Sequence, residues 1–283
     1  MDHTLERLLP PSNEEPRVIH ESMRYSVFAG GKRVRPILAI AAYEIAGQTD
    51  EAIVPTACGL ELIHTYSLIH DDLPCMDDDD MRRGQPTNHK VYGEGMAVLA
   101  GDALLSLAFE CFLGRSLNGN IPIATLARAA GRIAQAIGTQ GLVGGQVMDI
   151  AGSSNDRKLS TLETTCRLKT GRLIEVSLEY GAILAGADDR TIKALCHYGQ
   201  ALGLAFQITD DILNVIGDAG IMGKSVNSDS AHRKVTFPEL LGLDTARANA
   251  QDWIQEAKNA ISPLGGSGWF LRELADYVLD RRS

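Results

Sequence analysis

Paired cysteines, dense basic runs and aromatic residues are all scarce in this chain of 283 residues. The 5 cysteines are scattered, odd in number and without a CxxC pair, which argues against a disulfide framework and against a zinc ribbon. Positive charge is in the minority, because 27 Lys and Arg stand against 36 Asp and Glu. A chain with this balance and no dense Lys/Arg cluster repels a phosphate backbone at long range, so we expect no nucleic-acid partner.

Long uninterrupted apolar runs are missing as well. The most apolar stretch, residues 96–112, contains Asp102 and Glu110 and falls short of a membrane span, so we predict none. The first residues, MDHTLER, carry acidic side chains and lead into two prolines, unlike a signal or transit peptide. We therefore expect a cytoplasmic protein. With 45% hydrophobic and 22% charged residues, the chain has enough apolar material for a sizeable core.

Alternating runs of β-branched and aromatic residues are few, whereas apolar residues rich in Ala and Leu recur three and four positions apart. This spacing predicts an all-α protein. Long helices are expected from Pro55 to just before Pro74, and over 92–111, 162–185 and 191–215. Polar connectors are expected at 152–156 and 217–234. Because no change of composition and no repeat divides the chain, we predict a single domain over residues 1–283.

The segment HDDLPCMDDDDMRRG, residues 70–84, contains six aspartates followed by two adjacent arginines. Asp71 and Asp72 end an apolar helix, where the helix dipole disfavours negative charge, so a cation should offset them. Oxygen ligands without thiolates or imidazole clusters suit a hard cation such as Mg²⁺. Arg82 and Arg83 offer planar forks for phosphate oxygens. A solvated acidic loop is the alternative interpretation.

A second acidic pair lies in FQITDDILN, residues 206–214, inside an apolar helix. Positions 207, 210, 211 and 214 are three or four apart, so their side chains share one face. Two carboxylates left unpaired in such surroundings would cost several kcal/mol. The pattern favours a metal between this face and the first aspartate segment, with a structural salt bridge as the alternative.

Together with GGKRVRP (30–36), HTYSLIH (64–70) and GDALL (101–105), these segments resemble the trans-prenyl diphosphate synthases. The likeness is strongest to the short-chain farnesyl and geranylgeranyl members and runs from about Tyr25 to Arg281. It implies a large helical bundle around a deep central cavity, three Mg²⁺ ions and a homodimer. The implied reaction is metal-assisted ionisation of an allylic diphosphate, dimethylallyl or geranyl, followed by attack of isopentenyl diphosphate and release of diphosphate. The sequence does not choose between Mg²⁺ and Mn²⁺.

The resemblance also assigns roles to individual residues. The implied metal ligands are Asp71, Asp72, Asp77, Asp210 and Asp211. The implied isopentenyl diphosphate site comprises Lys32, Arg35, His64 and Arg83. The implied allylic diphosphate site comprises Arg82, Lys169 and Lys224. Thr170 and Gln207 would place oxygen dipoles near the carbocation, and Phe206 a π face. Ordinary structural roles stay open: a basic helix start at 32–35, a core histidine at His64, an exposed turn at 169–171, a solvated Lys224 and a ragged tail at Arg281–Arg282.

Two features bear on activity and product. Asn214 stands where the family usually has a third aspartate, so we expect retained activity with weaker metal affinity. Tyr66 and Ser67 occupy the positions that floor the cavity in the family, and the aromatic ring favours a farnesyl (C15) product. The run 86–94, PTNHKVYGE, is closer to plastid and cyanobacterial geranylgeranyl synthases, so a C20 product is the alternative. A class I terpene cyclase and a non-catalytic partner subunit of a prenyl synthase are the remaining competitors.

Overall fold

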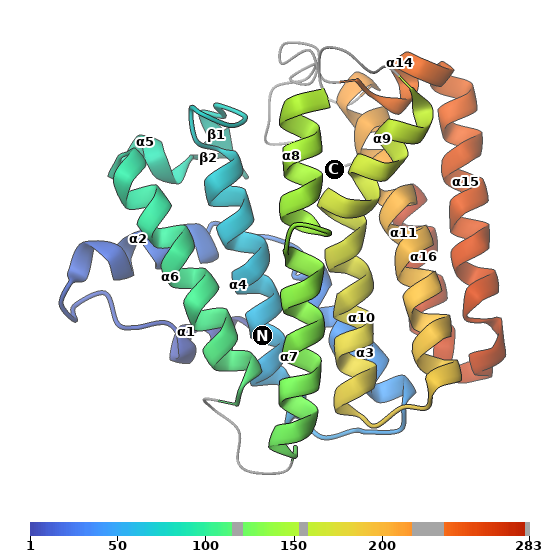
Figure 1. Cartoon of the computed structure of the whole chain (residues 1–283), viewed down its shortest axis with the longest axis horizontal. Coiled ribbons are helices and arrows are strands. Elements are labelled where there is room, and N and C mark those ends of the chain that lie inside the picture. The colour runs from blue at the N-terminus through green and yellow to red at the C-terminus, as the bar shows by residue number, and fades with distance from the viewer. Residues whose placement is uncertain (115–120, 153–157, 217–234, 281–283) are drawn as a thin grey trace. The chain divides into compact units, whose positions relative to one another are not determined.

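The structure is a computed structural model of the chain, and it describes residues 1–114, 121–152, 158–216 and 235–280 (Figure 1). Within these ranges the regular elements are helices, apart from one short hairpin. The all-α prediction is thereby confirmed. Contacts group the chain into two compact units, residues 1–40 with 50–130 (unit 1) and residues 41–49 with 131–283 (unit 2). A single domain over residues 1–283 stays a prediction.

Unit 1 contains the first aspartate segment. Its helices, in chain order, are α1 (Asp2–Leu8), α2 (Arg17–Val27), the start of α3 (Val34–Ile45), α4 (Ile53–Asp71), α5 (Asn88–Tyr92), α6 (Glu94–Phe112) and the start of α7 (Ile123–Ile137). Strands β1 (Met81–Arg82) and β2 (Gln85–Pro86) pair antiparallel, with Met81 opposite Pro86.

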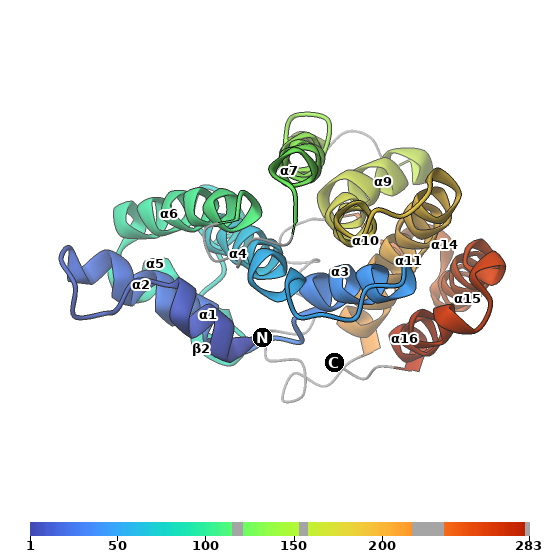
Figure 2. The same cartoon turned by 90° about the horizontal axis from the view of Figure 1, so that it is seen from below.

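Helices α4 and α6 pack against each other and form the core of unit 1, and they lie side by side in both views (Figures 1 and 2). Both are apolar on most sides, so Leu60, Ile63 and Leu104 are fully buried. The close approach depends on Gly59, because a Cβ there would lie 2.6 Å from the ring of Phe112. This packing fixes the end of α4, where the aspartates begin.

Helix α6 differs from the expectation for residues 96–112. It is 19 residues long, and by length and composition it could cross a membrane. The prediction that this stretch is too short for a span is therefore wrong as a statement of length. The helix carries Asp102 and buries Ala97 and Leu104 in unit 1. Buried core helices of soluble proteins can have the same length and composition as such a span.

Unit 2 contains the second aspartate segment. Its elements are the end of α3, the end of α7, α8 (Leu142–Gly152), α9 (Leu159–Cys166), the π-helix η1 (Arg167–Gly171), α10 (Arg172–Leu184), α11 (Asp189–Ile216), α14 (Phe237–Leu241), α15 (Leu243–Ala260), the 3-10 helix η2 (Ser262–Gly268) and α16 (Trp269–Asp280). The helices predicted at 162–185 and 191–215 are thus confirmed, the first with a π-helical turn inside it.

Helix α11 is the central support of unit 2, packing on α10 along one side and on α15 along another (Figures 1 and 2). One buried cluster joins Cys166, Leu204, Ile208, Ile212 and Phe237 from α9, α11 and α14. Apolar positions four apart on α11 therefore face this cluster, and the polar positions 207, 210, 211 and 214 follow a neighbouring stripe.

Candidate active site

The first aspartate segment starts at the C-terminus of α4 and folds back on the helix end. Asp71 is the last helical residue, and its carbonyl oxygen accepts a hydrogen bond from the backbone N–H of Asp77 at 2.8 Å. The N–H of Asp78 donates to the carbonyl of Leu73 at 3.1 Å. The chain is thus turned so that Asp71 and Asp77 become neighbours, although Pro74 separates them in sequence.

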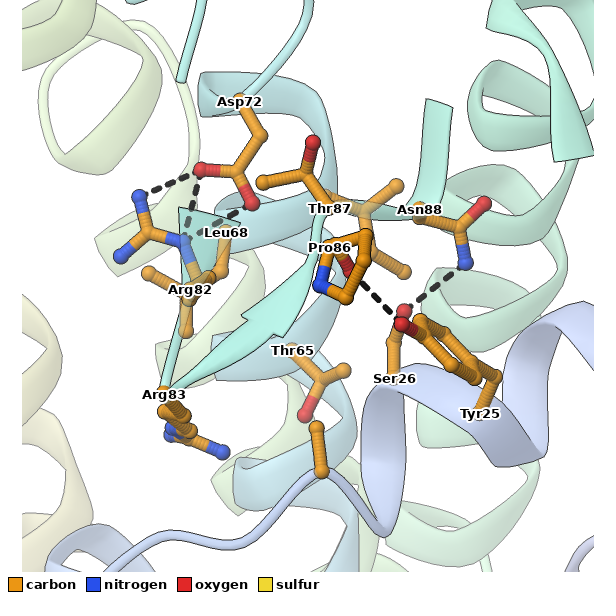
Figure 3. A pocket seen from close by; sticks show the side chains of 12 residues that line it. Tyr25, Ser26, Thr65, Leu68, Asp72, Arg82, Arg83, Pro86, Thr87 and Asn88 are labelled. Atoms are coloured by element: carbon orange, nitrogen blue, oxygen red, sulfur yellow. Dashed lines mark hydrogen bonds and ion pairs between the residues drawn. The ribbon is translucent and has the colours of Figure 1, made fainter. Parts of the chain in front are cut away.

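Asp72 has a different role from Asp71. It is buried, and its two carboxylate oxygens accept hydrogen bonds from Nε of Arg82 at 2.6 and 2.8 Å (Figure 3). Arg82 also contacts Asp79 at 3.2 Å. These carboxylates favour the charged form, so the pKa of Arg82 is raised although burial opposes it. Arg82, predicted to bind phosphate, therefore also links Asp72 and Asp79 of its own segment.

Arg83 sits at the tip of the β1–β2 hairpin. Arg83 and Gly84 both have positive φ, 53° and 75°, as a two-residue type I′ turn requires. Its guanidinium donates to the carbonyl of Gly30 and lies so close to Gly31 that a Cβ there would be 2.7 Å from Nη1. The backbone of Gly30 and Gly31 therefore forms the contact surface for the guanidinium of Arg83, and we call these two residues the seat of Arg83.

A group of basic side chains surrounds this seat, and we call Arg35, His64 and Arg83 the basic cluster. Burial lowers the pKa of Arg35 to about 10, with the charge of Arg83 adding to the effect and that of Glu61 opposing it. Burial, and then the charges of Arg35 and Arg83, lowers the pKa of His64 well below 6.5. Lys32 is exposed at the start of the same loop. Two mutually repelling cations, Arg35 and Arg83, beside a histidine kept neutral, suit an anionic ligand.

A small, partly open pocket lies beside the hairpin, lined by Tyr25, Thr65, Asp72, Arg82, Arg83 and Asn88, among others (Figure 3). Helix α2 closes one side, since Tyr25 donates to the carbonyl of Pro86 at 2.7 Å and Asn88 donates to Oγ of Ser26 at 2.8 Å. The hydroxyl of Thr65 is buried without a hydrogen-bond partner among the described residues. Arg82, Arg83 and the hydroxyl of Thr65 line this pocket, and side chains of these kinds bind phosphate oxygens.

The two residues predicted to set chain length lie on α4, one turn before the aspartates. Tyr66 is buried and its ring packs edge-on against His70, with centroids 5.8 Å apart. Ser67 turns its hydroxyl back to the carbonyl of His64 at 2.9 Å. Tyr66 is therefore the bulkier of the two, and its ring is buried.

The second aspartate segment lies near the end of α11, in unit 2. Asp210 is exposed, whereas Asp211 and Asn214 are buried. Asp211 accepts hydrogen bonds on both oxygens, from Nε2 of Gln207 at 2.9 Å and from the backbone N–H of Phe237 at 3.0 Å. Neutral donors thus hold this buried carboxylate.

A polar relay continues from Asp211 toward η1. The hydroxyl of Thr170 donates to Oε1 of Gln207 at 3.1 Å, so Thr170, Gln207 and Asp211 form one chain of hydrogen bonds. Thr170 and Gln207, predicted to act near the carbocation, are therefore brought together. Phe206, the third of that group, is half-buried on α11.

Lys169 and Thr170 lie in the π-helical turn, a feature often found at functional sites. Backbones approach this turn closely from two sides. A Cβ on Gly145 would lie 2.2 Å from the backbone N of Lys169, and a Cβ on Gly203 would lie 2.6 Å from Cα of Gly171. Helices α8 and α11 can therefore hold the turn only because these positions are glycine.

Sequence reasoning missed Asp149 and Glu61. Asp149 on α8 pairs with Nζ of Lys169 at 2.7 Å, so the predicted diphosphate lysine has a carboxylate partner in this structure. Glu61 on α4 is 1% exposed and pairs with Arg33 at 2.8 Å. Each is an acidic residue within an apolar helix, a signal that could have identified both. Lys224 and Arg281–Arg282 lie outside the described residues.

Carboxylates also gather on the outer side of the first segment. Ligand atoms of Asp78, Asp80 and His89 lie within 4.8 Å of one another. None of them belongs to the predicted metal set, and Asp80 pairs with Lys90 at 2.6 Å. The Mg²⁺ site predicted at Asp71 and Asp77 stays a prediction, and its ligands would be oxygen atoms alone, as a hard cation prefers.

The family profile named polyprenyl synthetase matches residues 16–262. The chain belongs to the polyprenyl synthetase family. Its members named here include a geranylgeranyl diphosphate synthase from Cyanophora paradoxa, 43% identical over 284 residues and covering 100% of this chain and 93% of the relative. A chloroplastic geranylgeranyl pyrophosphate synthase from Catharanthus roseus is 49% identical, covering 88% of this chain and 69% of the relative.

One further relative is the large subunit 1 of a heterodimeric geranylgeranyl pyrophosphate synthase of Arabidopsis thaliana, 48% identical over 95% of this chain and 74% of its own length. Among solved structures, an FPP/GFPP synthase from Zymomonas mobilis matches with a TM-score of 0.86 and 36% identity, over 98% of this chain and 94% of that one. This polyprenyl synthetase is therefore a trans-prenyltransferase with the all-α fold of the isoprenyl synthases.

Proposed function

We propose that this polyprenyl synthetase makes geranylgeranyl diphosphate (C20) by adding isopentenyl diphosphate to allylic diphosphates. The observation that carries the proposal is the set of relatives named geranylgeranyl synthases, at 43–49% identity over most of the chain. Tyr66 alone favoured a C15 product, with C20 as the alternative. The names of the relatives support the alternative.

Mg²⁺ is the cofactor that we propose, with Asp71, Asp77 and Asp210 as ligands. Hard oxygen donors on two segments suit an ion that also takes phosphate oxygens. Bound there, the metal would offset charge on the departing diphosphate and let the allylic C–O bond ionise. Because Asp72 and Asp211 are held by Arg82 and by the Gln207–Phe237 pair, we assign them to orientation and not to ligation.

The cationic side chains would divide between the two substrates. The basic cluster with Lys32 takes isopentenyl diphosphate, since the charges of Arg35 and Arg83 oppose each other there and an anion would relieve that repulsion. Arg82 and Lys169 take the allylic diphosphate, each preset by a carboxylate, Asp72 or Asp149. Lys224 is proposed for this second group from the family motif alone.

Carbon–carbon bond formation then needs little further from the chain. The double bond of isopentenyl diphosphate attacks the allylic carbon, and a proton passes to the released diphosphate. Oxygen dipoles of Thr170 and Gln207 would stabilise the positive carbon, and they are 3.1 Å apart in one hydrogen-bonded relay. The buried ring of Tyr66 would meet the growing chain.

A C15 product is the second candidate, supported by the buried Tyr66 and by the FPP/GFPP synthase neighbour. The test is product length from purified protein with isopentenyl diphosphate, Mg²⁺ and each of dimethylallyl, geranyl and farnesyl diphosphates. We expect C20 from all three starters. Accumulation of C15, with farnesyl diphosphate left unextended, would overturn the C20 proposal in favour of C15.

Tyr66→Ala sharpens this test, because removing a buried ring lengthens the space before the aspartates. We expect the variant to release products longer than those of the unchanged protein, with total condensation within about fivefold. Ser67→Ala is the matched control, since its hydroxyl already turns to its own helix. Unchanged lengths in both variants would place the floor of the cavity elsewhere.

We also propose a homodimer, supported by exposed apolar side chains on α6, where Leu99 is 55% and Val98 40% exposed. Mass measurement at low concentration tests it, and a persistent monomer would contradict it. One relative is the large subunit of a heterodimeric enzyme, so the measurement uses this chain alone. A dimer found under that condition contains two copies of it. The cytoplasmic location stays a prediction, because several relatives are named chloroplastic.

A further inference from the structure

Three residues other than glycine have positive φ among the described residues: Arg33 (50°), Asp78 (50°) and Arg83 (53°). Asp78 belongs to the aspartate loop, and Arg83 to a turn type that demands this conformation. Arg33 has neither reason. Left-handed backbone costs an L-residue about 1–2 kcal/mol, so something must hold Arg33 in place.

The side chain of Arg33 is held at three points. It donates to Oε1 of Glu61 at 2.8 Å, to the carbonyl of Val27 at 2.7 Å and to Oδ1 of Asp2 at 3.0 Å. Only 9% of Arg33 and 1% of Glu61 is exposed. A guanidinium with three acceptors is fixed in direction, which also fixes the loop that carries it.

The loop that carries Arg33 runs from Gly30 to Arg33 and connects the seat of Arg83 with the start of α3, whose second residue is Arg35. Gly30 and Gly31 have φ of 99° and 132°, and Arg33 follows them at 50°. Arg33 therefore turns inward to Glu61 at the point where the chain must place Arg35 in the basic cluster. Arg33 is an anchor, although it sits between two residues assigned to substrate.

Glu61 connects the anchor with the cluster. One of its oxygens binds Arg33, and the other, Oε2, is buried without a hydrogen-bond partner among the described residues. Nε of Arg35 is buried and lacks a partner in the same sense. The charge of Glu61 favours the protonated forms of both Arg35 and Arg83, against burial and against their mutual repulsion.

We propose that the Arg33–Glu61 ion pair is a positioning device for the isopentenyl diphosphate site. Arg33 fixes the 30–33 loop and with it the start of α3, and Glu61 acts as an internal counterion that keeps Arg35 and Arg83 together before the diphosphate arrives. The inference rests on the proposed function, since it takes that diphosphate as the ligand. Neither residue touches substrate in this account.

The test compares Glu61→Gln with Glu179→Gln. Glu179 in unit 2 is a matched control, because it is 6% exposed, pairs with Arg132 through one oxygen at 2.7 Å and has its Oε2 buried without a partner in the described part of the chain. We expect Glu61→Gln to raise KM for isopentenyl diphosphate about tenfold or more, with kcat and KM for the allylic substrate within about twofold. Glu179→Gln should leave both KM values unchanged at a similar loss of thermal stability.

Calorimetry of isopentenyl diphosphate with chelator present separates this inference from the proposed function. Without metal only the cationic site should bind, and Glu61→Gln should weaken that binding tenfold, whether or not the protein condenses substrates. A lack of product in every assay would defeat the proposed function alone. Equal affinity in Glu61→Gln and the unchanged protein would overturn the inference.

A second variant covers the case in which Glu61→Gln does not fold. Arg33→Gln combined with Glu61→Gln replaces the ion pair by two amides that can hydrogen-bond, so neither position 33 nor position 61 keeps a buried charge without its partner. We expect the double variant to fold and to show the same selective rise in KM for isopentenyl diphosphate. A double variant with unchanged KM would also overturn the inference.

Discussion

The two aspartate segments hold their buried carboxylates in different ways. In unit 1, Asp72 is bound by the guanidinium of Arg82, so an arginine of the same segment balances the charge of this carboxylate. In unit 2, Asp211 is bound by the amide of Gln207 and the backbone N–H of Phe237, which are neutral. The aspartate segment of unit 1 therefore carries its own cations for a diphosphate, whereas the cation assigned to diphosphate in the described part of unit 2 is Lys169, on the π-helical turn and outside the aspartate segment.

The largest effect should come from breaking the charged side of this comparison. Asp72→Asn removes the negative charge that pairs with the largely buried Arg82, and breaking a buried ion pair costs about 3–5 kcal/mol. We expect kcat/KM to fall about a hundredfold or more and the melting temperature to drop. Asp80→Asn is the control, since Asp80 pairs with Lys90 at the surface and should change little. Equal effects of the two would show that the Asp72–Arg82 pair has no special role.

A smaller effect is expected on the neutral side. Asp211→Asn keeps one acceptor oxygen but places an amide N–H against a donor, Gln207 or Phe237, at a cost of about 1–3 kcal/mol. We expect kcat/KM to fall about tenfold and the Mg²⁺ concentration for half-maximal rate to rise. Rate measurements over a Mg²⁺ series check this. A larger loss than in Asp72→Asn would reverse the comparison.

Stability should depend on pH through His64, a residue of the basic cluster in unit 1. Burial and nearby arginines hold its pKa well below 6.5, so below that pH the unfolded chain binds a proton that the folded chain does not. Stability therefore falls as pH drops through 6.5 toward the lower folded pKa, and the histidine adds no slope above 6.5. His64→Asn should flatten this limb in urea titrations from pH 5 to 8. The exposed His3→Asn should leave the limb as it is, and a flattened limb there would contradict the assignment.

The smallest effect concerns Asn214, buried on α11 one turn after Asp210. Restoring the family aspartate adds one negative charge near the proposed metal ligands. We expect Asn214→Asp to lower the Mg²⁺ requirement a few-fold at nearly unchanged maximal rate. An identical Mg²⁺ dependence in both proteins would show that the departure at this position has no effect on metal affinity.

The sequence predicted the helices well because their apolar spacing is regular over many turns, as in α6 and α11. It also singled out Thr170 and Gln207, which the structure joins at 3.1 Å. The π-helical turn could not be foreseen, since it arises from the close approach of α8 and α11 at Gly145 and Gly203. Such an approach is a property of packing and not of local propensity.

The inward direction of Arg33 was equally out of reach. The segment GGKRVRP has three cations within four residues, and the resemblance assigns only Lys32 and Arg35 to substrate. What separates Arg33 from them is a backbone angle and a buried partner 28 residues later, Glu61. Product length also lies beyond local pattern, because Tyr66 favours C15 while the named relatives favour C20.

On this account, metal is needed to bind the allylic diphosphate and not to bind isopentenyl diphosphate. The most direct test is calorimetric binding of each substrate with Mg²⁺ and with chelator. Isopentenyl diphosphate and a non-ionisable thio analogue of farnesyl diphosphate would be titrated separately into the unchanged protein. We predict that chelator leaves the affinity for isopentenyl diphosphate within about twofold and lowers that for the allylic analogue by a hundredfold or more. Equal sensitivity of both ligands to chelator would contradict the account.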